Sequence, residues 1–112
     1  MVPERIRERY MRDPLPVRLG GLAMDLARIA SCADDPRDRD ALISLLEEGK
    51  WFAEWTATDA PVNIQEQLAE IQLQLALWQR RWLAGHAVPT MRIEAQRWSE
   101  ALLELSGLLQ QS

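Results

Sequence analysis

Apolar side chains recur at alternating spacings of three and four residues along most of this chain, and this pattern is the strongest constraint on its fold. The clearest series is Ile64, Leu68, Ile71, Leu75, Trp78 and Trp82. Such a series lies on one side of a helix with 3.6 residues per turn. Similar series begin at Leu15, Leu42 and Met91. The sequence therefore predicts four amphipathic helices and no strands.

Prolines and capping residues set the expected helix boundaries. The first main helix is expected over about residues 16–33, the second from the Asp34-Asp35-Pro36 start signal to about residue 57. Asn63 and Glu66 resemble a capping box, and Gly85 can end that third helix in a left-handed conformation. The fourth runs from about residue 91 nearly to the C-terminus. We expect one all-α domain over residues 1–112, an antiparallel up-down bundle of four main helices with a short N-terminal helical arm at residues 1–14.

Charge and cysteine content narrow the possible surroundings of the protein. Its 112 residues carry a formal net charge of −4, which argues against general binding to nucleic acid. Residues 1–13 are charged, unlike a secretory signal, and no apolar run approaches the roughly 18 residues of a membrane span. Cys32 is the only cysteine, so no internal disulfide can form. These features predict a cytoplasmic protein that does not bind a membrane.

The residues that usually carry chemistry are sparse. His86 is the only histidine and stands in a predicted turn, so with Cys32 it supplies too few ligands for a di-iron or zinc site. The acidic cluster Asp34, Asp35, Asp38 and Asp40 lacks the spacing of a calcium loop. Glu47, Glu48 and Glu54 are expected on a wet helix face beside Lys50. We therefore predict no catalytic residue, no metal and no cofactor.

Several helices carry apolar residues on a second side. Trp51 is expected to point roughly 160° away from the main stripe of its helix, with Trp55 one turn further. Leu73 and Leu77 likewise oppose the main stripe of the third helix. We predict an interaction surface formed by Trp51, Trp55, Leu73 and Leu77. The alternative is a monomer whose N-terminal arm packs over part of this surface.

The first main helix has a second face of its own. It is expected to present Val17, Gly20, Met24 and Ala27. Gly20 and Gly21 lie inside that helix, where each destabilises by about 1 kcal/mol relative to alanine. Their presence predicts a close approach by another backbone, within the chain or from a second chain.

Three segments carry a family resemblance. They are LLEEGKWFAEWTA at 45–57, QLALW at 74–78 and WSEALLELSGLL at 98–109. With them the chain resembles a family of small uncharacterised cyanobacterial proteins from about Arg18 onward. The resemblance implies a cytoplasmic, lineage-specific accessory role, and the family has no assigned activity or functional residues to carry over.

Three kinds of function are compatible with these features. The first is a non-enzymatic interaction module, self-associating as a homodimer or binding an unidentified protein partner. The second is a small-molecule-binding or enzymatic bundle whose apolar pocket is lined by Trp78, Trp82 and Trp98. The third uses the arginines of the arm on nucleic acid or an anionic membrane, which Glu4, Glu8 and Asp13 disfavour by interrupting the basic residues.

Overall fold

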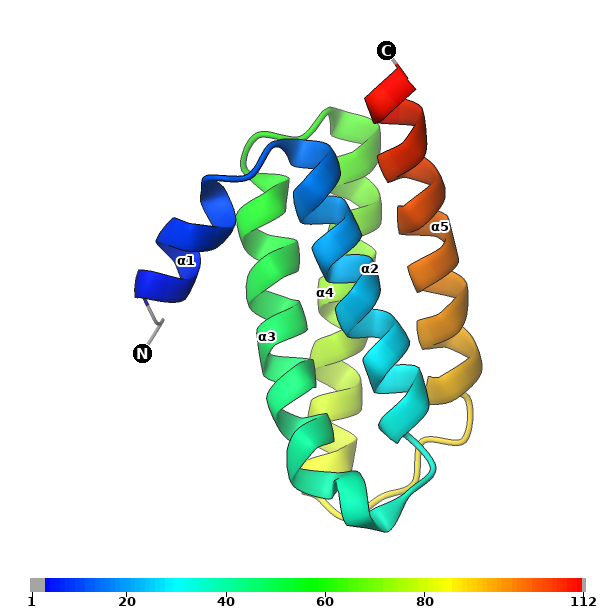
Figure 1. The fold of residues 1–112 in the computed structure, drawn as a ribbon. Helices are drawn as coiled ribbons and strands as arrows, with labels where there is room; N and C mark the ends of the chain where they lie inside the picture. Colours follow the sequence, from blue (N-terminus) through cyan, green and yellow to red (C-terminus); the bar gives the residue numbers. More distant parts are fainter. Residues whose placement is uncertain (1–3, 112) are drawn as a thin grey trace.

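The protein is an all-α bundle of four antiparallel helices with a short additional helix at the N-terminus (Figure 1). The computed structural model describes residues 4–111 and the side chains of residues 4–109. Helix α1 spans Glu4–Met11, α2 Leu15–Cys32, α3 Arg39–Ala57, α4 Val62–Leu83 and α5 Met91–Gln111, with a single 3₁₀ turn, η1, at Pro36–Asp38. The predicted arm is thus α1 and its connection, apart from residues 1–3, which lie outside the described residues.

The predicted capping residues at Asp35 and Gly85 act as expected at their helix ends, whereas the predicted capping box at Asn63 does not form. The Asp35 carboxylate accepts a hydrogen bond from the Arg37 backbone N–H at 2.9 Å and caps η1. Gly85 has φ +81° after α4, as predicted. The predicted capping box at Asn63 is wrong: α4 begins at Val62, directly after Pro61, and no side chain caps it. Pro61 is the N-cap residue instead: its carbonyl accepts a hydrogen bond from the Gln65 backbone N–H at 2.9 Å, so α4 begins before Asn63.

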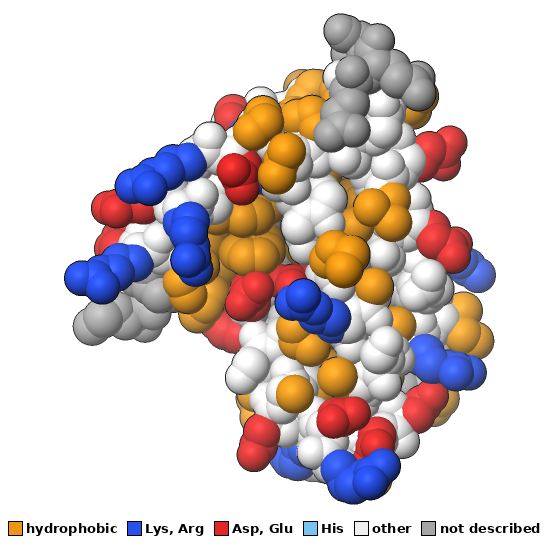
Figure 2. Space-filling model, in the orientation of Figure 1, with side chains coloured by type: hydrophobic (Ala, Val, Ile, Leu, Met, Phe, Trp, Pro, Cys, Tyr) orange, Lys and Arg blue, Asp and Glu red, His pale blue; other side chains and the backbone are white. Residues whose placement is uncertain are grey.

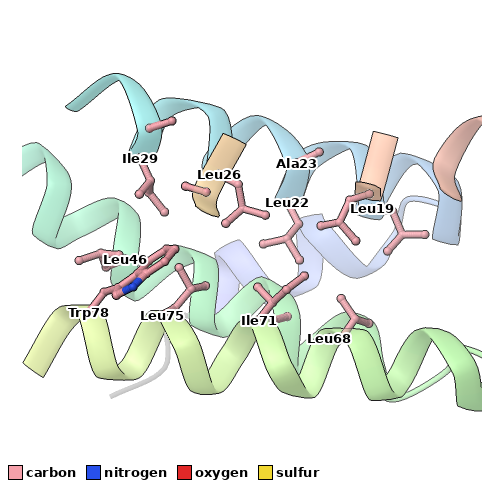
Figure 3. Packing of buried hydrophobic residues seen from close by; sticks show 14 of the residues in the cluster. Leu19, Leu22, Ala23, Leu26, Ile29, Leu46, Leu68, Ile71, Leu75 and Trp78 are labelled. Carbon is pink, nitrogen blue, oxygen red and sulfur yellow. The ribbon is translucent and has the colours of Figure 1, made fainter. Parts of the chain in front are cut away.

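The core lies between α2 and α4, with α3 and α5 closing its sides (Figure 3). Leu19, Leu22, Leu26 and Ile29 of α2 face Leu68, Ile71, Leu75 and Trp78 of α4. All eight are at most 3% exposed. The main stripes expected from the sequence are therefore the buried ones.

Two hydrogen bonds fix the register of the closely packed pair α2 and α5. The Ser106 hydroxyl donates to the Pro16 carbonyl at 2.8 Å, and the Ser99 hydroxyl donates to the Ala23 carbonyl at 2.7 Å. The two helices run antiparallel, so Leu103 of α5 lies near the level of Gly20 on α2. This register places side chains of α5 beside the outward face of α2.

The remaining tryptophans of the predicted core lie at its edge. Trp82 and Trp98 are half-buried and pack against the core cluster. The guanidinium of Arg39 lies 5.8 Å from the centre of the Trp82 ring. The Trp82 indole N–H is buried without a hydrogen-bond acceptor among the described residues.

Candidate interaction surface

Helix α1 covers a small aromatic cluster on α3. The Tyr10 ring stacks on Phe52, with centroids 4.0 Å apart and planes 9° apart, and Trp55 lies 5.9 Å from both rings. Trp51 stacks on Trp55 at 6.1 Å and is half-buried. Trp55 is only 4% exposed, so its assignment to an exposed interaction surface is wrong. Of the alternative, a monomer whose arm packs over part of this surface, the packing of the arm is seen at Trp55.

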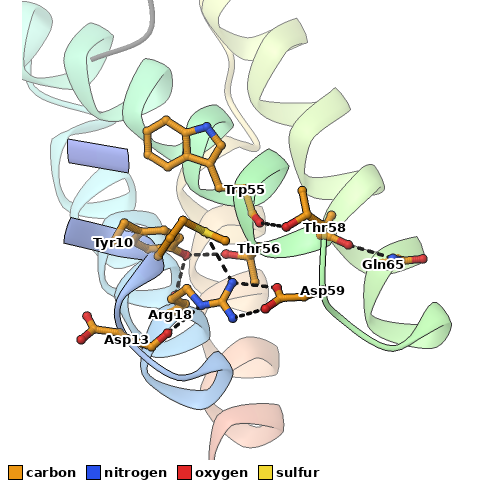
Figure 4. A network of polar contacts seen from close by, with 10 residues as sticks. Tyr10, Asp13, Arg18, Trp55, Thr56, Thr58, Asp59 and Gln65 are labelled. Carbon is orange, nitrogen blue, oxygen red and sulfur yellow. Dashed lines mark hydrogen bonds and ion pairs between the residues drawn. The ribbon is translucent and has the colours of Figure 1, made fainter. Parts of the chain in front are cut away.

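A polar network ties α1 to the ends of α2 and α3 (Figure 4). The Tyr10 hydroxyl donates to the Arg18 carbonyl at 2.9 Å and shares a hydrogen bond with the Thr56 hydroxyl. The Arg18 guanidinium makes two hydrogen bonds to the Asp59 carboxylate, at 2.8 and 2.7 Å, and a third to the Asp13 carbonyl at 3.0 Å. A bidentate pair of this kind fixes orientation as well as charge. The network is therefore a structural anchor for the arm.

The pKa shifts in this network have simple causes. The hydrogen bonds between Arg18 and Asp59 lower the pKa of the Asp59 carboxyl group and raise the pKa of the Arg18 guanidinium. Burial raises the pKa of the Tyr10 phenol well above its usual range. All three groups therefore keep their ordinary charge at neutral pH.

Leu73 and Leu77 lie elsewhere, on the outer side of α4. Leu73 is 63% and Leu77 45% exposed. Helix α4 is at the back of the bundle in Figure 1, whereas α2 is at the front. Since Trp55 is covered, the four residues predicted as one surface do not form one exposed patch.

A different exposed face runs along α2. Val17 and Met24 are 45% and 51% exposed, and Leu103 of α5, near the level of Gly20 on α2, is 49% exposed. Figure 2 views the molecule from this side and shows hydrophobic side chains scattered over α2 and the seam between α2 and α5. We call Val17, Gly20, Gly21, Met24 and Arg28 the α2 face. Its apolar part agrees with the second face expected for this helix, whereas the neighbouring Leu103 and the charged Arg28 were missed.

The glycine pair at the centre of the α2 face has neighbours within the chain but is not required by them. A Cβ atom at Gly20 would lie 3.8 Å from the Ser106 hydroxyl oxygen, and one at Gly21 would lie 3.8 Å from a Tyr10 ring carbon. Both are ordinary contact distances, and both glycines have negative φ. Alanine would therefore fit at either position and would favour the helix by about 1 kcal/mol.

The carboxyl group of Asp25 is buried, which the sequence analysis did not predict. Asp25 lies between Leu22 and Ile29 on the inward side of α2 and is 3% exposed, and its Oδ2 has no hydrogen-bond partner among the described residues. Burial raises the pKa of Asp25 to about 8; the neighbouring Glu48 carboxyl group adds to the rise, and Arg28 opposes it. A charged residue within an apolar stripe is the signal that could have revealed this site.

Asp25 gives a prediction for stability against pH. Its pKa is about 4 in an unfolded chain and about 8 in the folded one, so the folded state binds more protons between these values and loses stability as pH rises through them. Replacing Asp25 with asparagine should remove this loss, with a gain relative to wild type on the order of 2 kcal/mol at pH 8. Urea unfolding at about pH 4.5 and at about pH 8 measures the difference in the free energy of unfolding. An equal effect at both pH values would contradict the assignment.

Neither of two cavities on the bundle is the predicted pocket lined by Trp78, Trp82 and Trp98. An open groove of about 530 Å³ lies between α2 and α5, lined by Ser31, Ile93 and Arg97 among others. A hollow of about 230 Å³ between α4 and α5 touches Trp78, with Gln74, Arg81 and Glu94 beside it. Neither Trp82 nor Trp98 lines this hollow, and neither cavity reaches Asp25. The three tryptophans of the expected pocket therefore do not share it.

The metal candidates of the sequence are dispersed. His86 lies in the exposed turn after α4, and Cys32, at the end of α2, is half-buried, with burial raising the pKa of its thiol. Asp34 pairs with Arg92 at 3.2 Å, and Asp35 pairs with Arg37 at 3.0 Å. Over residues 4–111 no three potential ligands gather in a geometry that fits a metal ion.

Glu47, another of the acidic candidates, has partners within the bundle. Its carboxylate accepts a hydrogen bond from Gln79 at 2.7 Å and pairs with Lys50 at 2.9 Å. The hydrogen bond from Gln79 is the main cause that lowers the pKa of Glu47, and Lys50 adds to it. These contacts join α3 to α4, which gives Glu47 a structural role.

None of the helices in the described part of the chain combines the length and the apolar character needed to cross a bilayer.

Comparison with models of protein families, with curated proteins and with solved structures finds no match. The class that the structure defines is thus an all-α four-helix bundle with an N-terminal helix packed on its side.

Proposed function

We propose that the protein is a non-enzymatic interaction module that associates with further copies of itself through the α2 face. One observation carries the proposal: Val17 and Met24 stay exposed around a glycine pair that the packing of the chain does not require. Val17 and Met24 are large apolar side chains exposed on the same helix face, and exposed apolar side chains of this kind are found where proteins contact one another. The open centre of this face would let another helix approach closely.

The buried groups of the bundle support a binding role over a catalytic one. Arg18 and Tyr10 are occupied in anchoring the arm, and Asp25 is enclosed between α2 and α3. A catalytic carboxyl group needs access to a substrate in a cleft. We propose a cytoplasmic location for the module, since a lone half-buried thiol suits a reducing compartment.

Replacing Met24 with glutamate tests the working surface. Met24 is exposed, so the substitution should leave the bundle folded while placing a charge in the contact. We expect self-association to weaken by about 2 kcal/mol or more. Sedimentation equilibrium over a concentration series measures it, and circular dichroism on the same samples checks the helical content.

Leu73→Glu is the matched control, because Leu73 is exposed on α4 at the opposite side of the bundle. It should leave self-association unchanged. If Leu73→Glu disrupts association and Met24→Glu does not, the working surface lies on α4. A wild-type protein that stays monomeric would overturn the proposal itself.

A further inference from the structure

The α2 face has an internal symmetry about its glycine pair. Val17 and Met24 each lie 3.5 residues from the midpoint between Gly20 and Gly21. Seven residues correspond to almost two full turns of helix, so the two side chains share one side of α2. The exposed apolar residues are therefore placed equally on both sides of the point where the helix is narrowest.

Opposite charges lie on either side of this apolar centre at equal separations in the sequence. Asp13 stands just before the start of α2 and Arg28 lies near its end, each 7.5 residues from the same midpoint. For Arg28, which lies within α2, that separation is about 11 Å along the helix axis, whereas Asp13 precedes the first residue of the helix by two positions. The Arg28 side chain is 63% exposed, and its one ion pair among the described residues, to Asp25, is long at 3.9 Å. The exposed Asp13 carboxylate makes no ion pair within residues 4–111.

Such a face is complementary to a second copy of itself turned end to end. In an antiparallel pair centred on the glycines, each Val17 meets the partner's Met24 and each Asp13 meets the partner's Arg28. A twofold axis makes both contacts twice. A parallel pair would instead oppose like charges at both ends, which is unfavourable.

We propose that two copies pair through the α2 face in an antiparallel, twofold arrangement centred on Gly20 and Gly21. This inference rests on the proposed function and adds the partner, a second copy of this chain, and its register. Leu103 lies near the level of Gly20, so it extends the apolar contact beside the crossing point. The pairs between Asp13 of one copy and Arg28 of the other favour the antiparallel orientation over the parallel one.

Charge reversal tests the pairing of the two ends. Asp13→Arg alone and Arg28→Asp alone each turn both attractive pairs into repulsive ones, and each should weaken self-association by about tenfold. An equimolar mixture of the two variants restores both attractive pairs between unlike chains. The mixture should therefore form a heterodimer with a dissociation constant within about threefold of the wild-type value.

Glu70→Arg and Arg81→Asp serve as controls, because both residues are exposed on α4. Glu70→Arg changes the net charge by the same amount as Asp13→Arg, and Arg81→Asp by the same amount as Arg28→Asp. Neither control should alter association, alone or mixed. If the mixture of Asp13→Arg and Arg28→Asp stays monomeric while the wild type dimerises, the antiparallel register is wrong and the proposed function stands. If the wild type does not dimerise, the proposed function fails with it.

Disulfide trapping tests the same register without changing charge. In a Cys32→Ala background, Val17→Cys is mixed with Met24→Cys, one chain carrying a mass tag. The proposed register brings these two positions together, whereas two copies of position 17 lie about 10.5 Å apart along the axis, too far for a disulfide. Mixed disulfide dimers should predominate. Predominance of Val17→Cys homodimers would overturn the arrangement, and trapping of a foreign protein in place of a second copy would overturn the choice of partner.

Discussion

Replacing Leu75 with alanine will lower the free energy of unfolding by about 2–5 kcal/mol. Leu75 is fully buried, and one of its methyl groups lies 3.0 Å from the point where a Cβ atom would stand on Gly49 of α3. The side chain thus fills space against bare backbone, and the bundle cannot collapse easily around the cavity that alanine would leave. Urea unfolding followed by circular dichroism measures the change.

Leu73→Ala provides the matched comparison on the same helix. Leu73 is 63% exposed, so its truncation should change the free energy of unfolding by less than about 0.5 kcal/mol. Comparable losses for the two variants would mean that the buried side of α4 is wrongly assigned.

Replacing Tyr10 with alanine will detach α1 and destabilise the protein by about 3 kcal/mol. Tyr10 is the one buried residue of α1 in the described structure. Its ring stacks on Phe52, and its hydroxyl joins Arg18 to Thr56. Its loss should also uncover Trp55, which is expected to shift tryptophan fluorescence to longer wavelength.

Tyr10→Phe separates the two contributions of this residue. It keeps the ring stack and removes the hydroxyl, so it should destabilise by only about 1 kcal/mol and leave the tryptophan emission unchanged. If Tyr10→Ala changes neither stability nor fluorescence, α1 does not cover the aromatic cluster.

The helices could be predicted from the sequence because their periodicity is a local property. The series from Ile64 to Trp82 and from Leu19 to Ile29 each identify the buried side of one helix without knowledge of the others. Gly85 likewise marks the end of α4 through its own backbone. At the start of α4 the sequence carries two start signals, a proline and a possible capping box, and the helix follows Pro61 and not the expected Asn63.

The cover over Trp55 could not be predicted in the same way. Helix α1 offers little apolar surface, and its decisive contact joins Tyr10 to Thr56 across 46 residues of chain. The angle of Trp55 on its helix does place it outside the main core cluster. Sequence periodicity gives that angle but does not say which distant segment will cover the residue.

The α2 face could likewise be predicted only in part from the sequence. Its apolar and small residues follow from helical spacing, whereas the spare room at Gly20 and Gly21 depends on Ser106 and Tyr10 from distant segments. The surrounding Leu103 depends on the register between α2 and α5. The proposed interface is therefore centred on the exposed Val17 and Met24 and not on the covered Trp55.

Sedimentation equilibrium of the wild-type protein tests the central claim, self-association, most directly. Over roughly 1–100 µM, a range that brackets micromolar dissociation constants, the average mass should rise reversibly from the 12.9 kDa of one chain toward twice that value. A mass that remains at 12.9 kDa across the series would contradict the account.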